Sequence, residues 1–73
     1  MPPELPTVSG RDVVRALERL GFSAVRQRGS HVVMRRETAG CVVPLHRELK
    51  IGTLISVLKQ AGIQREAFLA ALR

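Results

Sequence analysis

His31 is the residue of this sequence best suited to proton transfer, because it follows a Gly-Ser pair and has several arginines close by in the chain. Imidazole can both accept and donate a proton near neutral pH, and cationic neighbours favour its neutral form, which acts as a base. Gly29 allows an anion to approach the backbone, and Ser30 adds a hydroxyl group. These residues predict a site that binds a phosphodiester and moves a proton beside it. The simpler interpretation is a histidine that caps a turn at a strand edge.

His46 is the second histidine, and it lies next to Arg47 at the end of a predicted strand. If the sheet returns this part of the chain to His31, the two imidazoles can form an acid–base pair. The alternative is that His46 anchors the following loop through hydrogen bonds. Both interpretations stay open at this point.

Basic residues near the histidines are the predicted ligands of the anion. Arg28 directly precedes the Gly-Ser pair, and strand alternation puts Arg35 on the same face as His31. Lys50 lies just before a predicted helix start, where free N–H groups favour an anion. These three assignments, Arg28, Arg35 and Lys50, are inferred from charge and position alone.

The charge balance of the whole chain is strongly basic. Twelve Lys and Arg residues stand against six Asp and Glu, so the 73-residue chain has a formal net charge of +6. Ten of the twelve are arginines, whose planar guanidinium group matches phosphate oxygens. A small basic domain of this kind indicates nucleic acid first. The alternatives are an arginine-rich genomic composition and an acidic protein partner.

Composition also excludes several classes of protein. The single cysteine, Cys41, rules out an intramolecular disulfide, and together with only two histidines it argues against a four-ligand zinc site. No Gly-rich phosphate loop fits the chain, so we expect neither a cofactor nor a metal. No apolar run is long enough to span a membrane, and residues 1–6 lack the features of a signal peptide. We therefore expect a cytoplasmic protein.

A capping box predicts the start of the first helix. Ser9 can cap this helix with Asp12 three residues further on, while Val8 and Val13 occupy the positions of a hydrophobic staple. Apolar residues follow at helical spacing until Gly21, which ends the helix. Residues 1–8 are expected to be a flexible N-terminal segment, and residues 9–73 a single domain.

Three strand-like runs follow the helix, over residues 22–28, 31–36 and 41–45. The Gly-Ser pair turns the chain between the first two runs, and residues 37–40 turn it again. Pro44 has no backbone donor, so the third strand should lie at a sheet edge or end there. The spacing predicts a three-stranded antiparallel sheet.

Two helices complete the chain. Thr53 is expected to cap the first of them, which Gly62 ends, and the second runs over residues 65–73. The order α-β-β-β-α-α predicts an α+β fold whose helices pack on one face of the sheet and leave the other face partly open. Residues expected in the core include Phe22, Cys41, Phe68, Leu69 and Leu72.

The ordered set of these motifs resembles the HicA family, the small toxins of HicA–HicB toxin–antitoxin pairs. The resemblance rests on Gly29-Ser30-His31 before an apolar strand, then Val43-Pro44-Leu45-His46 and Lys50-Ile51-Gly52-Thr53-Leu54. The run Leu-Glu-Arg-Leu-Gly-Phe at 17–22 precedes these motifs, and Gln-Ala-Gly-Ile at 60–63 follows them. It covers about residues 9–70, nearly the whole chain.

This resemblance implies a fold like the double-stranded RNA-binding domain and an mRNA interferase, an endoribonuclease that cleaves mRNA without a metal. The family's essential histidine follows the Gly-Ser pair, so its role carries over to His31, with Gly29 and Ser30 as the turn that presents it. His46 matches the family's histidine after the strand-ending proline, as a second acid–base group or a structural residue. The implied partners are mRNA and a HicB-like antitoxin, for which the basic surface predicts an acidic complement.

Three other functions stay open. A non-catalytic RNA-binding module of the same fold needs the basic surface but not His31. A DNA-binding helix-turn-helix over residues 53–73 would place Gly62 in its turn, but its second helix offers almost no donors for base edges. A structural subunit of an acidic partner would bind protein and not RNA.

Overall fold

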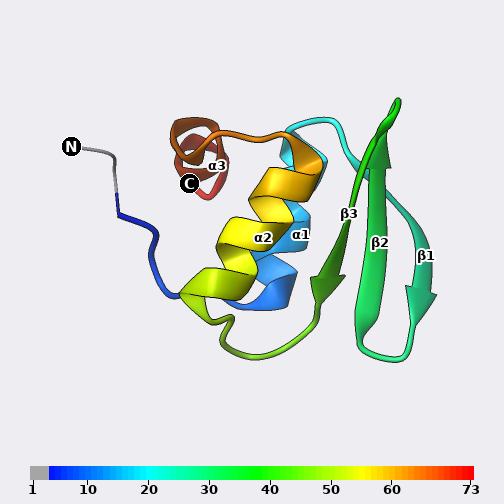
Figure 1. Cartoon of the computed structure of the whole chain (residues 1–73), viewed down its shortest axis with the longest axis horizontal. Coiled ribbons are helices and arrows are strands. Elements are labelled where there is room, and N and C mark those ends of the chain that lie inside the picture. Colours follow the sequence, from blue (N-terminus) through cyan, green and yellow to red (C-terminus); the bar gives the residue numbers. More distant parts are fainter. Residues whose placement is uncertain (1–3) are drawn as a thin grey trace.

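The computed structural model describes residues 4–73 as three helices and one three-stranded sheet (Figure 1). The elements are α1 (Gly10–Arg19), β1 (Ser23–Arg28), β2 (His31–Arg36), β3 (Ala39–Pro44), α2 (Ile51–Ala61) and α3 (Arg65–Ala71). The strands are antiparallel in the order β1-β2-β3, and the helices lie on one side of the sheet. The α+β fold class and the order of elements predicted from the sequence are confirmed.

The predicted capping box begins α1. The Asp12 backbone N–H donates to the Ser9 hydroxyl at 3.1 Å, and the Ser9 N–H donates to the Asp12 carboxylate at 3.2 Å. Two of the otherwise unpaired N–H groups at the helix start are thereby satisfied. Val8 and Val13, on either side of the cap, are both buried in the core.

The sheet follows from the alternation along β2. Val32 and Met34 are buried under the helices, whereas His31 and Arg35 are exposed on the opposite, open face. The predicted strands differ from the observed ones only at their ends. β1 begins after Phe22, whose ring is buried, and β3 begins at Ala39, which already pairs with Arg36. As expected, β3 is an edge strand and ends at Pro44.

The prediction that Thr53 caps α2 was wrong. The helix begins at Ile51 with Lys50 as its N-cap, and no side chain caps it. The reason is a tertiary contact: Leu49 is buried, and its N–H donates to the Val8 carbonyl at 2.8 Å. This anchor fixes the chain just before Lys50, so the helix starts there rather than at a better capping residue. Its predicted end at Gly62 is confirmed by the left-handed conformation of that glycine.

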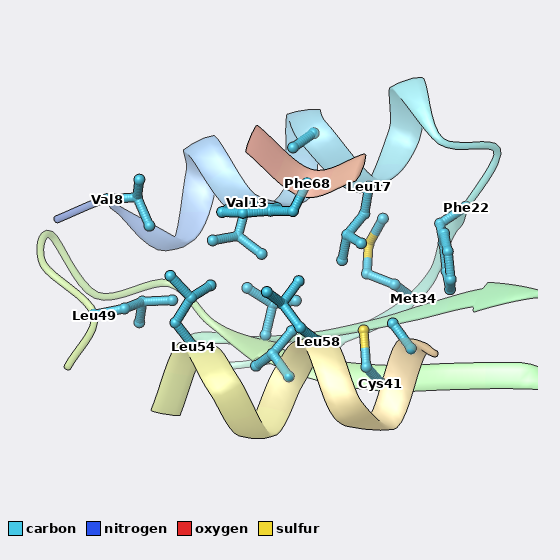
Figure 2. Packing of buried hydrophobic residues seen from close by; sticks show 14 of the residues in the cluster. Val8, Val13, Leu17, Phe22, Met34, Cys41, Leu49, Leu54, Leu58 and Phe68 are labelled. Carbon is cyan, nitrogen blue, oxygen red and sulfur yellow. The ribbon is translucent and has the colours of Figure 1, made fainter. Parts of the chain in front are cut away.

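The core lies between the helices and the covered face of β2 and β3 (Figure 2). Cys41, Phe22 and Phe68 are buried as predicted, while Leu69 and Leu72 are half-buried. The N-terminal segment predicted for residues 1–8 falls partly on residues 1–3, which lie outside the described residues. Its last residue, Val8, belongs to the packed core and lies near Leu49 at one end of the cluster.

β1 extends beyond the cover of the helices. All six of its residues are exposed, whereas β2 and β3 each bury alternate side chains. α2 packs mainly on β3, and α1, which lies behind α2 in Figure 1, contacts both β1 and β3. A margin of the sheet that the helices leave uncovered therefore runs along α1, on the side of β1.

Candidate active site

His31 occupies the first position of β2, directly after the tight turn that joins it to β1. In the register of the sheet it lies opposite Arg28 on one side and Pro44 on the other. Residues directly opposite in an antiparallel pair share a face and have Cβ atoms about 4.5–5.5 Å apart. The exposed side chains of His31 and Arg28 therefore leave neighbouring positions of the sheet at this end of the open face.

The turn before His31 needs its glycine. Gly29 has a φ of 54°, in the left-handed region that disfavours side chains. Its carbonyl accepts a hydrogen bond from the side-chain amide of Gln27 at 3.0 Å. The carbonyl of Ser30 accepts a short hydrogen bond from the Leu45 N–H, at 2.6 Å. This bond ties the turn to the residue just before His46.

The structure brings the two histidines together. Their ring centroids lie 6.5 Å apart, with the ring planes at 72°. Within residues 4–73, neither imidazole donates or accepts a side-chain hydrogen bond, so both are available to a ligand. The backbone of His46 is held by its carbonyl, which accepts from the Gly10 N–H at 2.9 Å. The loop is thus anchored through the main chain, and the ring is left free.

The three basic residues predicted to bind the anion take different positions. Arg28 lies opposite His31, as described above. Arg35 shares the open face but lies four residues along β2, a distance of about 13 Å at roughly 3.3 Å per residue. Lys50 is exposed at the start of α2, beyond the loop that follows His46. Of the three, only Arg28 is directly beside the histidine.

Sequence reasoning missed residues that the first helix contributes to this site. Arg11 and Ser9 join Leu45, His46 and Arg47 around a groove of about 210 Å³. Gly10 makes this possible, because a Cβ atom there would collide with the Pro44 carbonyl and lie 2.7 Å from the Leu45 Cα. The close approach joins elements distant in the chain, and no local pattern signals it.

Other chemistry finds little support in the described part of the chain. Residues 4–73 contain no cluster of three or more His, Cys, Asp or Glu side chains that could hold a metal ion. Burial raises the pKa of the Cys41 thiol from 9.0 to about 11, so it stays protonated and is a poor nucleophile. None of the helices within residues 4–73 has the length and apolar character that crossing a membrane requires.

The fold and the site together define a small basic α+β domain whose α-β-β-β-α core presents two histidines at one end of its sheet. Residues 10–63 match the family model described as the HicA toxin of bacterial toxin–antitoxin systems. The match spans most of the chain, which therefore belongs to the HicA toxin family. It is a toxin of the toxin–antitoxin type, a class that acts in the context of an antitoxin partner. Comparison with curated proteins gives no match.

Proposed function

We propose that this toxin is a metal-independent endoribonuclease that cleaves mRNA, with His31 as general base and His46 as general acid. The observation that carries the proposal is the pair of exposed imidazoles 6.5 Å apart, beside Arg28, in a member of a toxin family. RNA supplies its own nucleophile, the 2′-OH. The protein then needs only a base, an acid and charge stabilisation.

The reaction follows from this arrangement. His31 removes the proton of the 2′-OH, and the 2′ oxygen attacks the neighbouring phosphorus. The bond from phosphorus to the 5′ oxygen breaks as His46 donates a proton to that oxygen. The products are a 2′,3′-cyclic phosphate and a free 5′-OH, and the guanidinium of Arg28 stabilises the negative charge on the non-bridging oxygens. DNA has no 2′-OH and is not cut.

The distance between the two imidazole rings fits a general base and a general acid that act on one phosphate. The attacking and leaving oxygens lie on opposite sides of the phosphorus, and each catalytic nitrogen must come within about 2.6–3.2 Å of its oxygen. Two rings with centroids 6.5 Å apart leave room for one phosphate between them. A pair in direct hydrogen bond would first have to separate.

The test uses the purified chain with two end-labelled oligonucleotides of the same base sequence, one with ribose and one with 2′-deoxyribose throughout. We expect cleavage of the first only, in the presence or absence of EDTA. His31→Ala should lower the rate by about 10²–10⁴-fold, the usual contribution of a positioned acid or base. Arg65→Ala, an exchange at the start of α3, serves as the control and should leave the rate unchanged.

Two results would contradict the proposal. Equal cleavage of the deoxyribose strand would exclude attack by the 2′-OH, and loss of activity in EDTA would show that a metal takes part. If His31→Ala retains growth arrest and RNA binding in cells, the chain is instead a non-catalytic RNA-binding module. The measurements are therefore gel analysis of total RNA and growth after induction of each variant.

The same proposal covers the partner and the place of action. A net charge of +6 favours an antitoxin whose contact surface is acidic, which we take to be a HicB-like protein. Since the substrate is mRNA, the toxin acts in the cytoplasm. Association with the antitoxin should weaken as the salt concentration rises, because exposed charges are screened beyond about 8–10 Å.

A further inference from the structure

Two adjoining grooves lead from His46 along α1. The first groove has a volume of about 210 Å³ and is lined in part by His46 and Arg47. The second, of about 260 Å³, lies between α1 and the uncovered margin of the sheet. Arg11 and Leu45 line both grooves, so the two grooves adjoin at these residues. We call the two together the α1 groove.

The arginines of the α1 groove, like Arg26, Arg28 and Arg35 on the sheet, have no hydrogen-bonding partner within residues 4–73. Within residues 4–73, Arg11, Arg15 and Arg47 are exposed and donate no hydrogen bond. By contrast, Arg19 donates to the carbonyls of Ala71 and Arg73, both at 2.7 Å.

Arg36 is likewise committed to the fold. It donates to the Leu20 carbonyl at 2.7 Å and lies 4.8 Å above the Phe22 ring. The structure therefore separates arginines that hold the fold together from arginines that face solvent in the groove. Guanidinium groups of the second kind are free to bind phosphate in a bidentate manner.

We propose that the α1 groove binds the RNA strand next to the cleaved bond, with flanking phosphates on Arg11 and Arg15. This inference rests on the proposed function for the identity of the ligand. Val14, Val32 and Leu45 give the groove an apolar floor against which a ribose or base can pack. The one acidic residue in the lining, Glu18, lies beyond Arg15 on α1 and marks the end of the phosphate path.

The position of Arg11 and Arg15 supports this path over one along the open sheet face. They lie four residues apart on α1 and therefore project from the same side of the helix. Arg11 lines the same small groove as His46, so a strand held there is adjacent to the site of cleavage. The open face carries several cations: Arg28 lies opposite His31 and Arg26 opposite Val33, while Arg35 is about 13 Å along the strand from His31 by the strand rise. The open face is therefore the alternative path for the RNA strand.

The experiment measures RNA binding separately from cleavage. The full chain carries His31→Ala, so the RNA stays intact, and the probe is a fluorescein-labelled single-stranded RNA followed by fluorescence anisotropy. Arg11→Ala with Arg15→Ala in this background should raise Kd at least about tenfold. It should also lower the slope of log K against log salt by about 1.4, since each single-strand phosphate contact contributes about 0.7.

The matched control removes the same charge from the opposite end of the molecule. Lys59→Ala with Arg65→Ala lies at the end of α2 and the start of α3, and it should change Kd by less than about twofold since neither residue lies near the groove. All four substitutions introduce alanine, which has the highest helix propensity, into a helix. A thermal unfolding curve for each variant verifies that it is folded.

The outcomes separate the proposed RNA-binding role of the α1 groove from the proposed nuclease activity. Equal weakening in the two double variants would mean that only net charge matters and would overturn the groove. Stronger weakening by Arg26→Ala with Arg35→Ala would place the RNA on the open sheet face instead. Cleavage by the wild type with no effect of Arg11 and Arg15 would refute the groove alone. Groove-dependent binding without cleavage by the wild type would refute the nuclease alone, and no RNA binding by any variant would refute both.

Discussion

At the scale of single residues, the division of roles between the two imidazoles is the main question for mechanism. His31 follows a turn that fixes its backbone, and His46 is held by its carbonyl to α1, so each ring is positioned by its own segment of the chain. A base and an acid respond differently to the leaving group, because only the acid is needed to protonate it.

A substrate with a better leaving group should therefore rescue one variant and not the other. When sulfur replaces the 5′ oxygen at the cleaved bond, the departing thiolate needs no proton, because thiols have a pKa of about 8.5. We expect His46→Ala to cleave this RNA within about tenfold of the wild type, while His31→Ala stays impaired by about 10²-fold or more. Rates from single-turnover assays give the comparison. Equal rescue of both variants would show that His46 is not the acid.

Cys41 gives a residue-scale prediction that reports on folding. Burial raises the pKa of its thiol from 9.0 to about 11, so folding favours the protonated form. This contribution to stability is complete below pH 9 and is lost as the pH rises towards 11. At pH 8 the folded chain should react with iodoacetamide about a hundredfold more slowly than the chain in denaturant, as followed by mass spectrometry. Similar rates in both conditions would contradict the burial of this thiol.

At the scale of elements, the contact between the start of α1 and the end of β3 positions half of the site. Gly10 leaves no room for a Cβ atom against Pro44 and Leu45, and its N–H holds the His46 carbonyl. A methyl group here must push α1 away from the sheet. The same displacement moves His46 relative to His31 and widens the α1 groove at its His46 end.

Gly10→Ala should therefore reduce both stability and activity. We expect a loss of about 1–3 kcal/mol in the free energy of unfolding, the usual cost of overpacking, together with slower RNA cleavage. The matched control is Gly52→Ala inside α2, where a Cβ atom meets open space and alanine should stabilise the helix by about 0.5–1 kcal/mol. Chemical denaturation of the two variants measures the difference. A neutral Gly10→Ala would disprove the close approach.

The elements also show what sequence can and cannot provide. Ser9 with Asp12, Gly62 and Pro44 each act through neighbours in the chain, so their roles could be predicted from local patterns. Thr53 failed as a cap because Leu49 is anchored by Val8, more than forty positions away in the sequence. The two histidines could be predicted as candidate site residues from the sequence. The distance between their rings depends on how β3 pairs with β2, and the close approach of Gly10 to Pro44 depends on tertiary packing.

At the scale of the whole molecule, the proposed catalytic groups and the anchor of α3 lie at opposite ends. The β1–β2 turn, the end of β3 and the start of α1 meet at one end, and α3 joins the end of α1 at the other (Figure 1). Arg19 fastens α3 there, through two hydrogen bonds to the last turn of the chain. The two ends can therefore be perturbed separately.

Arg19→Ala should lower stability without changing the chemistry. Loss of two hydrogen bonds from a charged donor should cost about 1–3 kcal/mol, since each such bond contributes up to that order and the pair is partly solvated. The melting temperature should fall, while kcat for RNA cleavage, measured well below that temperature, should match the wild type. A fall in kcat at full folding would show that α3 influences the histidine end.

The strand order has a consequence for how the chain folds. Every strand pairs with its neighbour in sequence, and the histidines at positions 31 and 46 come together at one end of that sheet. Loops between such partners are short, so closing them costs little chain entropy. The bond from Arg19 to Ala71 spans 52 residues and closes a far longer loop. The two histidines thus come together through short-range contacts of the sheet, whereas α1 joins His46 through the Gly10 N–H only after a much longer loop has closed.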